Sequence, residues 1–135
     1  GVTRSFHKIA MRPGKPLMAG QRCETTFLGL PGNPVSAIFC GHLFLLPVVR
    51  RAMGLADVLP RAVIATLQPP LPKGGPRAHY MRAIYTEGAQ NRVVNAFDKQ
   101  DSSMLTVLAD ANCLLLQPVG APVMKAGERV TILPI

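Results

Sequence analysis

The feature that most constrains the fold of this sequence is a tight turn between an apolar segment and a long apolar stretch. Residues 25–30 read as a buried strand, and they lead directly into Pro31-Gly32-Asn33-Pro34. Asn33 suits a helix N-cap, and Pro34 suits the first helical position because its fixed φ is already helical. The junction therefore predicts a strand, a turn and a helix in immediate succession.

The predicted helix covers residues 34–53. Gly54 follows it where a left-handed C-cap glycine belongs, and Arg50 and Arg51 complement the negative end of the helix dipole. Pro47 lies inside the pattern and predicts a kink or a break, because proline has no N–H to donate. The apolar stretch is interrupted by polar residues and is shorter than the about 20 residues that cross a membrane. We therefore expect no membrane span.

The residues before this junction predict short extended pieces. Residues 6–11 favour a short strand, and residues 17–20 favour another. Residues 12–16 contain two prolines and one glycine, which exclude a helix and interrupt any strand ladder. A rigid loop between two strands is the prediction for this part of the chain.

The character of the sequence changes after Gly54. Residues 56–59 are typical of a linker, and residues 102–111 predict a short helix between strands. We therefore expect an α/β segment, residues 1–55, followed by a small β-rich, barrel-like domain, residues 56–135. The strands predicted for that domain cover residues 62–67, 78–85, 92–97, 113–117 and 128–133.

Positive charge is concentrated in the first part of the chain. The net charge is +8, and residues 1–54 contain seven basic residues against Glu24 as the one acid. Such a field suits anionic ligands, which include nucleic acid, a phosphorylated cofactor and an oxyanion. The chain has two Tyr, five Phe and no Trp, which is a poor supply of stacking platforms for single-stranded nucleic acid. An anionic small molecule is therefore favoured over nucleic acid.

Cysteine and histidine do not form a metal-binding pattern. The three cysteines have no CxxC spacing, and their odd number leaves at least one unpaired, which suggests buried thiols in a reducing, cytoplasmic setting. The three histidines also lack metal-like spacing. We expect His42 to be packed and hydrogen-bonded on an apolar helix, and Cys40 to belong to the core. No metal ligand is predicted in this segment.

Two neighbouring motifs carry the candidate chemistry. Gly32 and Asn33 precede a helix whose free N–H groups attract anions, and Ser36 adds a hydroxyl in the first turn. Arg12 and Lys15 flank a rigid Pro-Gly pair that fixes their directions. Each motif alone has a plainer interpretation as ordinary topology or as solvated surface charge. Their coincidence in one basic segment favours an anion site.

The two motifs together resemble a known family. AMRPGKPLMAG followed by FLGLPGNPVSA is similar to the signature of the molybdopterin molybdotransferases, which include the E-domain of gephyrin. The resemblance implies insertion of molybdate into adenylylated molybdopterin, with release of AMP and the finished molybdenum cofactor. It also implies that Arg12, Lys15, Pro16 and Ser36 contribute to the site for the oxyanion and the cofactor phosphate.

The β-rich part continues the resemblance with departures. Residues 77–82, RAHYMR, resemble an Arg-x-acid-aromatic-x-Arg strand, and residues 100–105, QDSSML, resemble a Gln-Gly-Ser segment. The comparison implies that Arg77 and Ser102 complete the molybdate site and that Arg82 is structural. His79 stands where the family has an acid, and Asp101 where it has glycine. A carboxylate there would repel molybdate if it pointed into the site.

The resemblance further implies a longer protein. Family chains begin with a pterin-binding portion that holds the acidic residues for Mg²⁺, so we expect this segment to be inactive alone and to expose apolar helix surface. The first residues contain neither an initiator methionine nor an apolar signal segment. The family implies a cytoplasmic homodimer. A basic nucleic-acid-binding module and a non-catalytic partner-binding scaffold remain alternatives.

Overall fold

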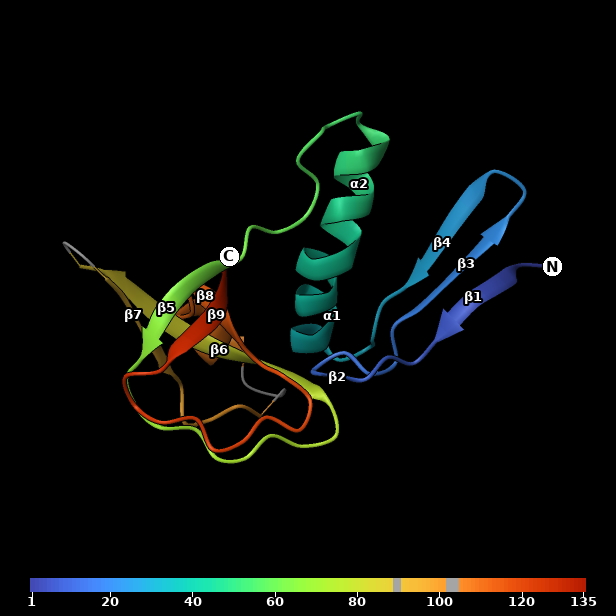
Figure 1. Ribbon diagram of the computed structural model, residues 1–135. Coiled ribbons are helices and arrows are strands. Elements are labelled where there is room, and N and C mark those ends of the chain that lie inside the picture. The colour runs from blue at the N-terminus through green and yellow to red at the C-terminus, as the bar shows by residue number, and fades with distance from the viewer. Residues whose placement is uncertain (89–90, 102–104) are drawn as a thin grey trace.

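The computed structural model describes residues 1–88, 91–101 and 105–135. Figure 1 shows a small sheet, a long helix and a barrel, with the helix between the other two. The small sheet contains β1, β3 and β4, and the barrel contains β5 to β9. The elements are β1 (Thr3–His7), β2 (Met11–Arg12), β3 (Met18–Arg22), β4 (Thr25–Gly29), α1 (Pro34–Cys40), η1 (Gly41–Leu45), α2 (Leu46–Ala52), β5 (Val63–Leu67), β6 (Ala78–Glu87), β7 (Arg92–Ala96), α3 (Leu105–Ala109), β8 (Cys113–Gln117) and β9 (Arg129–Pro134).

The small sheet is antiparallel, in the order β1-β3-β4. The predicted strand at residues 25–30 is confirmed as β4, but the prediction that it is buried is wrong, since Phe27 is 43% exposed. Phe27 lies on a face of the sheet that no other layer of the described chain covers. Alternating apolar residues show that a strand has an apolar face, but they do not show what covers it.

The strand predicted at residues 6–11 is divided in the structure. β1 ends at His7, and Lys8 has a positive φ of 69°, which turns the chain away from the sheet. β2 then pairs in parallel with β6, placing Arg12 opposite His79. The prediction was wrong because one continuous strand cannot pair with two separate sheets without this bend.

The long helix begins at Pro34, as predicted, and ends at Ala52, one residue before the predicted end. The Asn33 side chain accepts a hydrogen bond from the Ser36 N–H at 3.1 Å, which confirms the N-cap. At the other end Gly54 has a φ of +78° and donates to the Arg51 carbonyl at 3.0 Å. Leu55 donates to the Arg50 carbonyl at 3.1 Å, which completes a Schellman motif.

Pro47 does not break the helix. The preceding turn, η1, is π-helical, and the Leu46 N–H bonds to the Gly41 carbonyl instead of the carbonyl of residue 42. This shift in hydrogen bonding occurs next to the position where proline has no donor. The helix is therefore continuous over 19 residues and reaches the length and composition of a membrane-crossing helix, contrary to the count from the apolar stretch alone.

The β-rich part is a closed five-stranded barrel. The strand order is β6-β7-β5-β9-β8, and β8 pairs again with β6. β5 and β7 are parallel, while the other neighbours are antiparallel. This confirms the barrel-like prediction and all five predicted strands. The side chains that fill the barrel include Ala65, Leu67, Met81, Ala83, Val94, Leu115, Val130 and Ile132.

The helix packs on the outside of the barrel. Val35 and Phe39 of α1 bury their side chains against Leu114 of β8, with Tyr80 of β6 partly buried beside them. The predicted short helix is confirmed as α3, which contacts α1. The packing of α1 on the barrel and the pairing of β2 with β6 bring three parts of the chain together: the loop after β2, the start of the helix and the start of β6.

Candidate anion-binding site

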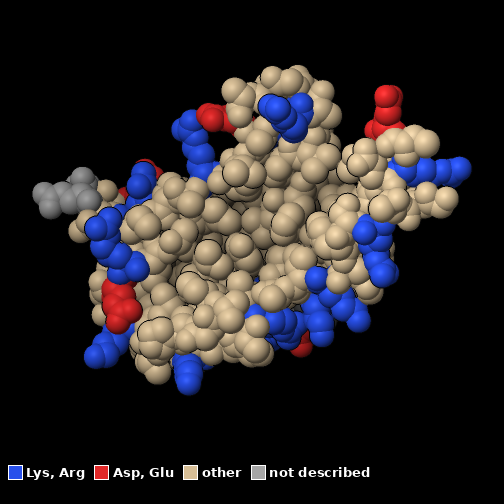
Figure 2. Space-filling model, turned by 45° about the vertical axis from the view of Figure 1, so that its right-hand side comes forward, with Lys and Arg blue, Asp and Glu red and all other residues tan. Residues whose placement is uncertain are grey.

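A pocket of about 550 Å³ lies where these three parts of the chain meet. Its fourth wall is residues 97–101, which connect β7 to the segment before α3. In Figure 2 basic side chains gather along the lower edge of the molecule, while uncharged surface fills the middle of that face. The described residues that line the pocket are Arg12, Pro13, Gly14, Lys15, Pro16, Ser36, Arg77, Asp98, Gln100 and Asp101.

The first wall is the loop between β2 and β3, which packs closely on the helix. Gly14 has a φ of +106°, and a Cβ there would lie 2.6 Å from the Cys40 Sγ. The Leu17 N–H donates to the Gly14 carbonyl and the Ile9 N–H to the Lys15 carbonyl, both at 3.0 Å. Glycine is therefore required at this position by both backbone conformation and space. The loop is fixed against α1 and leaves the Lys15 side chain exposed in the pocket.

The helix contributes one residue to the pocket, Ser36, which is only 7% exposed. The Asn33 cap holds the Ser36 N–H and so fixes the backbone of this first turn. Asn33 and Gly32 adjoin the pocket in sequence but are not among its lining residues. Gly32 is exposed, and no atom lies within 4 Å of a Cβ added there.

The third wall is the start of β6. Arg77 directly precedes the strand and is exposed, and His79 lies opposite Arg12 in the β2–β6 pairing. Burial first, and then the nearby positive charges of Arg12, Arg77 and Arg82, lower the pKa of His79 to about 4. His79 is therefore neutral at pH 7. The family that this sequence resembles has an acidic residue at this position, whereas the neutral His79 contributes no charge.

Three cations and two carboxylates thus line the described part of the pocket, and the balance is positive. The structure brings together Arg12, Lys15, Pro16, Ser36 and Arg77, which the sequence predicted as site residues. The predicted Ser102 lies outside the described residues. Sequence reasoning missed Asp98 and Gln100 as lining residues. Nothing in the sequence around Asp98 marked it, because it lies in a loop whose path depends on the barrel.

The acidic residues of this segment do not form a cation site. Among residues 1–88, 91–101 and 105–135, no group of three or more His, Cys, Asp or Glu side chains could hold a metal ion. The donor set of the described residues therefore does not fit a resident Mg²⁺.

The cysteines are free, as expected, but only two are buried. Burial raises the pKa of Cys40 to about 11 and that of Cys113 to about 12, so both thiols stay protonated at pH 7. The expectation of buried thiols is wrong for Cys23, which is exposed in the turn between β3 and β4. A tight turn of two hydrogen-bonded strands extends into solvent whatever residue occupies it.

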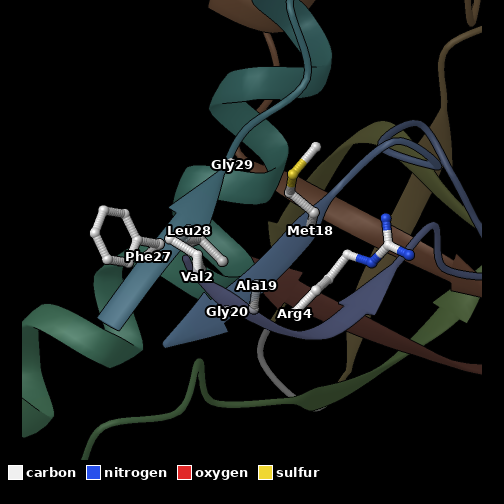
Figure 3. Close-up of a pocket in the computed structure, with 8 residues that line it drawn as sticks. All are labelled: Val2, Arg4, Met18, Ala19, Gly20, Phe27, Leu28 and Gly29. Carbon is white, nitrogen blue, oxygen red and sulfur yellow. The ribbon is translucent and has the colours of Figure 1, made fainter. Parts of the chain in front are cut away.

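A larger hollow, of about 700 Å³, lies on the open face of the small sheet. Figure 3 shows Met18 and Phe27 on the neighbouring strands β3 and β4 around it, Val2 just before β1, and Arg4 as the one charged residue among those drawn. Met18 and Phe27 are each 43% exposed. The surface is mostly apolar and contains few groups that could hold an anion. The exposed apolar surface that we expected belongs to the helix instead, where Leu45 is 39%, Val48 44% and Met53 71% exposed.

The fold and the pocket define a class of protein: a five-stranded barrel joined to a capped helix, with a basic pocket at the junction. Residues 65–135 match the family described as MoeA C-terminal region (domain IV). The chain belongs to the MoeA family.

Proteins of known name and structure support this assignment. Molybdopterin molybdenumtransferase from Staphylococcus aureus strain Mu50 is 35% identical over 131 residues, which are 95% of this chain and 30% of that protein. The protein of the same name from Haemophilus influenzae is 31% identical over 96% of this chain and 33% of its own length. A molybdenum cofactor biosynthesis protein from Pyrococcus furiosus superposes with a TM-score of 0.79 at 25% identity, over 99% of this chain and 46% of that one.

The chain spans only about a third of the length of these curated relatives, with coverage of 30% and 33%. What the relatives' names say about activity therefore describes proteins with more residues than these 135.

Proposed function

We propose that the protein containing this chain is a molybdopterin molybdotransferase, which inserts molybdate into adenylylated molybdopterin and releases AMP. The observation that carries the proposal is the convergence of Arg12, Lys15, Ser36 and Arg77 from three separate parts of the chain around one pocket. The relatives named molybdopterin molybdenumtransferase supply the reaction class. The segment described here provides the anion-binding side of the site.

The lining residues have the chemistry that a tetrahedral oxyanion requires. The Arg77 guanidinium offers planar paired donors, and the Lys15 ammonium is a compact cation on a flexible stem. Ser36 offers a hydroxyl from a helix turn whose backbone is fixed by its cap. Arg12 adds a second guanidinium from the same loop as Lys15. Fixed donors of this kind stabilise a dianion, and also the charge that develops on a phosphate during its cleavage.

Other parts of the proposal concern the whole protein. We propose that Mg²⁺ and the acidic residues that bind it belong to the portion of the relatives that this chain does not span. The same portion would provide most of the surface for adenylylated molybdopterin and for a homodimer. We also propose a cytoplasmic location. These proposals about Mg²⁺, adenylylated molybdopterin, the homodimer and the location leave the roles proposed for the pocket residues unchanged.

The test is molybdate binding by the full-length protein, measured by isothermal titration calorimetry. We expect Lys15→Ala and Arg77→Ala each to weaken binding by about 10- to 100-fold, because each removes a charge-assisted hydrogen bond worth about 1.5–3 kcal/mol. Lys125→Ala is the control, since Lys125 is an exposed cation away from this pocket. If both site variants bind molybdate as tightly as wild type, the pocket is not the molybdate site.

A further inference from the structure

Residues 97–101 form a wall of the pocket, and one glutamine fastens them to β6. The Gln100 Oε1 accepts a hydrogen bond from the Arg82 N–H at 3.0 Å. Its Nε2 donates to the Arg82 carbonyl at 2.9 Å and to the Phe97 carbonyl at 2.7 Å. The Phe97 N–H also donates to the Arg82 carbonyl, at 3.1 Å. Both backbone polar groups of residue 82 therefore hold this segment.

The side chain of Arg82 holds the same segment from the interior. It is 1% exposed, and its Nη2 donates to the Lys99 carbonyl at 3.3 Å and to the Asp101 carbonyl at 2.9 Å. Burial lowers the pKa of this guanidinium, and the charge of Asp101 acts in the opposite direction. A buried cation requires such partners, so the backbone carbonyls of the segment are drawn toward Arg82.

This arrangement decides where the carboxylates of the pocket lie. Asp98 and Asp101 are both exposed, and both line the pocket that contains Lys15 and Arg77. The interaction of two charges depends on their separation, so a shift of this wall changes how strongly the carboxylates oppose an anion. The segment also leads directly to residue 102.

We infer that Gln100 and Arg82 are positioning residues, which fix the wall at residues 97–101 in the geometry that lets the pocket accept an oxyanion. The inference deepens the proposed function and rests on it, because molybdate binding is its measure. Neither residue needs to touch the oxyanion. Their role is to hold Asp98 and Asp101 at fixed distances from the cations.

Asn112, which directly precedes β8, makes a matching pair of bonds to β6 and serves as the control for Gln100. The Asn112 Oδ1 accepts from the Tyr85 N–H at 2.8 Å, and its Nδ2 donates to the Tyr85 carbonyl at 2.9 Å. This is the same pair of bonds between a side-chain amide and both backbone groups of a β6 residue. Asn112 is also half-buried, but it does not line the anion pocket. The substitution of Asn112 therefore measures how much stability such a pair of hydrogen bonds provides at a place outside the pocket.

The experiment compares Gln100→Ala with Asn112→Ala in the full-length protein, with thermal unfolding and calorimetric titration of molybdate for both. We expect both variants to unfold at a lower temperature, since both lose two hydrogen bonds to a β6 residue, and Gln100→Ala to unfold lowest because it also loses the bond to the Phe97 carbonyl. Molybdate binding should weaken about tenfold or more in Gln100→Ala, which corresponds to the loss of about one net hydrogen bond, and should stay near wild type in Asn112→Ala. Arg82→Lys keeps the buried cation but not the fork of donors, and it should weaken binding as well.

The outcomes separate this inference from the proposed function. If Lys15→Ala weakens molybdate binding while Gln100→Ala and Arg82→Lys do not, the positioning role is overturned and the site stands. Equal weakening in Asn112→Ala would also overturn it, because the effect would then reflect general loss of structure. A wild-type protein that does not bind molybdate would overturn both.

Discussion

The substitution Gly14→Ala tests how the loop of the anion pocket is built. Gly14 has a φ of +106°, and an added Cβ would lie 2.6 Å from the Cys40 Sγ and 3.2 Å from the Met11 Cε. An L-residue in left-handed backbone costs about 1–2 kcal/mol. Overpacking against a buried neighbour costs about 1–3 kcal/mol more. We therefore expect Gly14→Ala to lower the free energy of unfolding by about 2–5 kcal/mol, the sum of those two ranges.

The two contributions can be separated at Cys40. Cys40→Ala removes the Sγ that the new methyl group would meet, and it leaves the backbone strain at residue 14 unchanged. In a double-mutant cycle, the loss in Gly14→Ala with Cys40→Ala should be about 1–3 kcal/mol smaller than the sum of the single losses. Urea unfolding followed by circular dichroism gives the free energy of unfolding of the wild type, the two single variants and the double variant. A loss under about 0.5 kcal/mol for Gly14→Ala, or an additive cycle, would refute this account of the loop.

The remaining predictions concern pH and the helix. His79 has a pKa near 4 in the fold against an ordinary value of 6.5, so the unfolded chain binds more protons between these values. Stability should therefore fall as pH decreases from about 6.5 to 4, by at most about 3 kcal/mol, and His79→Gln should remove that part of the pH dependence in urea titrations. Gly41 has an ordinary helical φ of −60° and open space at its Cβ, so Gly41→Ala should stabilise the protein by about 0.5–1 kcal/mol. Gly54 has a φ of +78°, and Gly54→Ala should destabilise it by about 1–2 kcal/mol, so equal effects of the two substitutions in thermal unfolding would contradict the C-cap assignment.

Local features of this chain follow from the sequence because they depend on neighbouring residues. The Asn33 cap and the Gly54 terminus of the helix rest on contacts within a few positions. The five barrel strands were predicted because alternating apolar residues and turn residues define each strand separately. The cations of the candidate site were found for a similar reason. Arg12 and Lys15 lie beside a Pro-Gly pair in a short motif.

The tertiary structure decided which of these elements meet and which surfaces are covered. The break between β1 and β2 follows from the pairing of Arg12 with His79, which lie far apart in the chain. Asp98 lines the pocket in a segment that Gln100 and Arg82 fasten to β6. The exposure of β4 arises because no layer of the described chain covers that face of the small sheet, and the residues of the strand alone do not determine what covers it. Helix caps and turns can therefore be predicted from neighbouring residues in the sequence. The position of the pocket wall at residues 97–101 and the covering of the small sheet depend on contacts between distant segments.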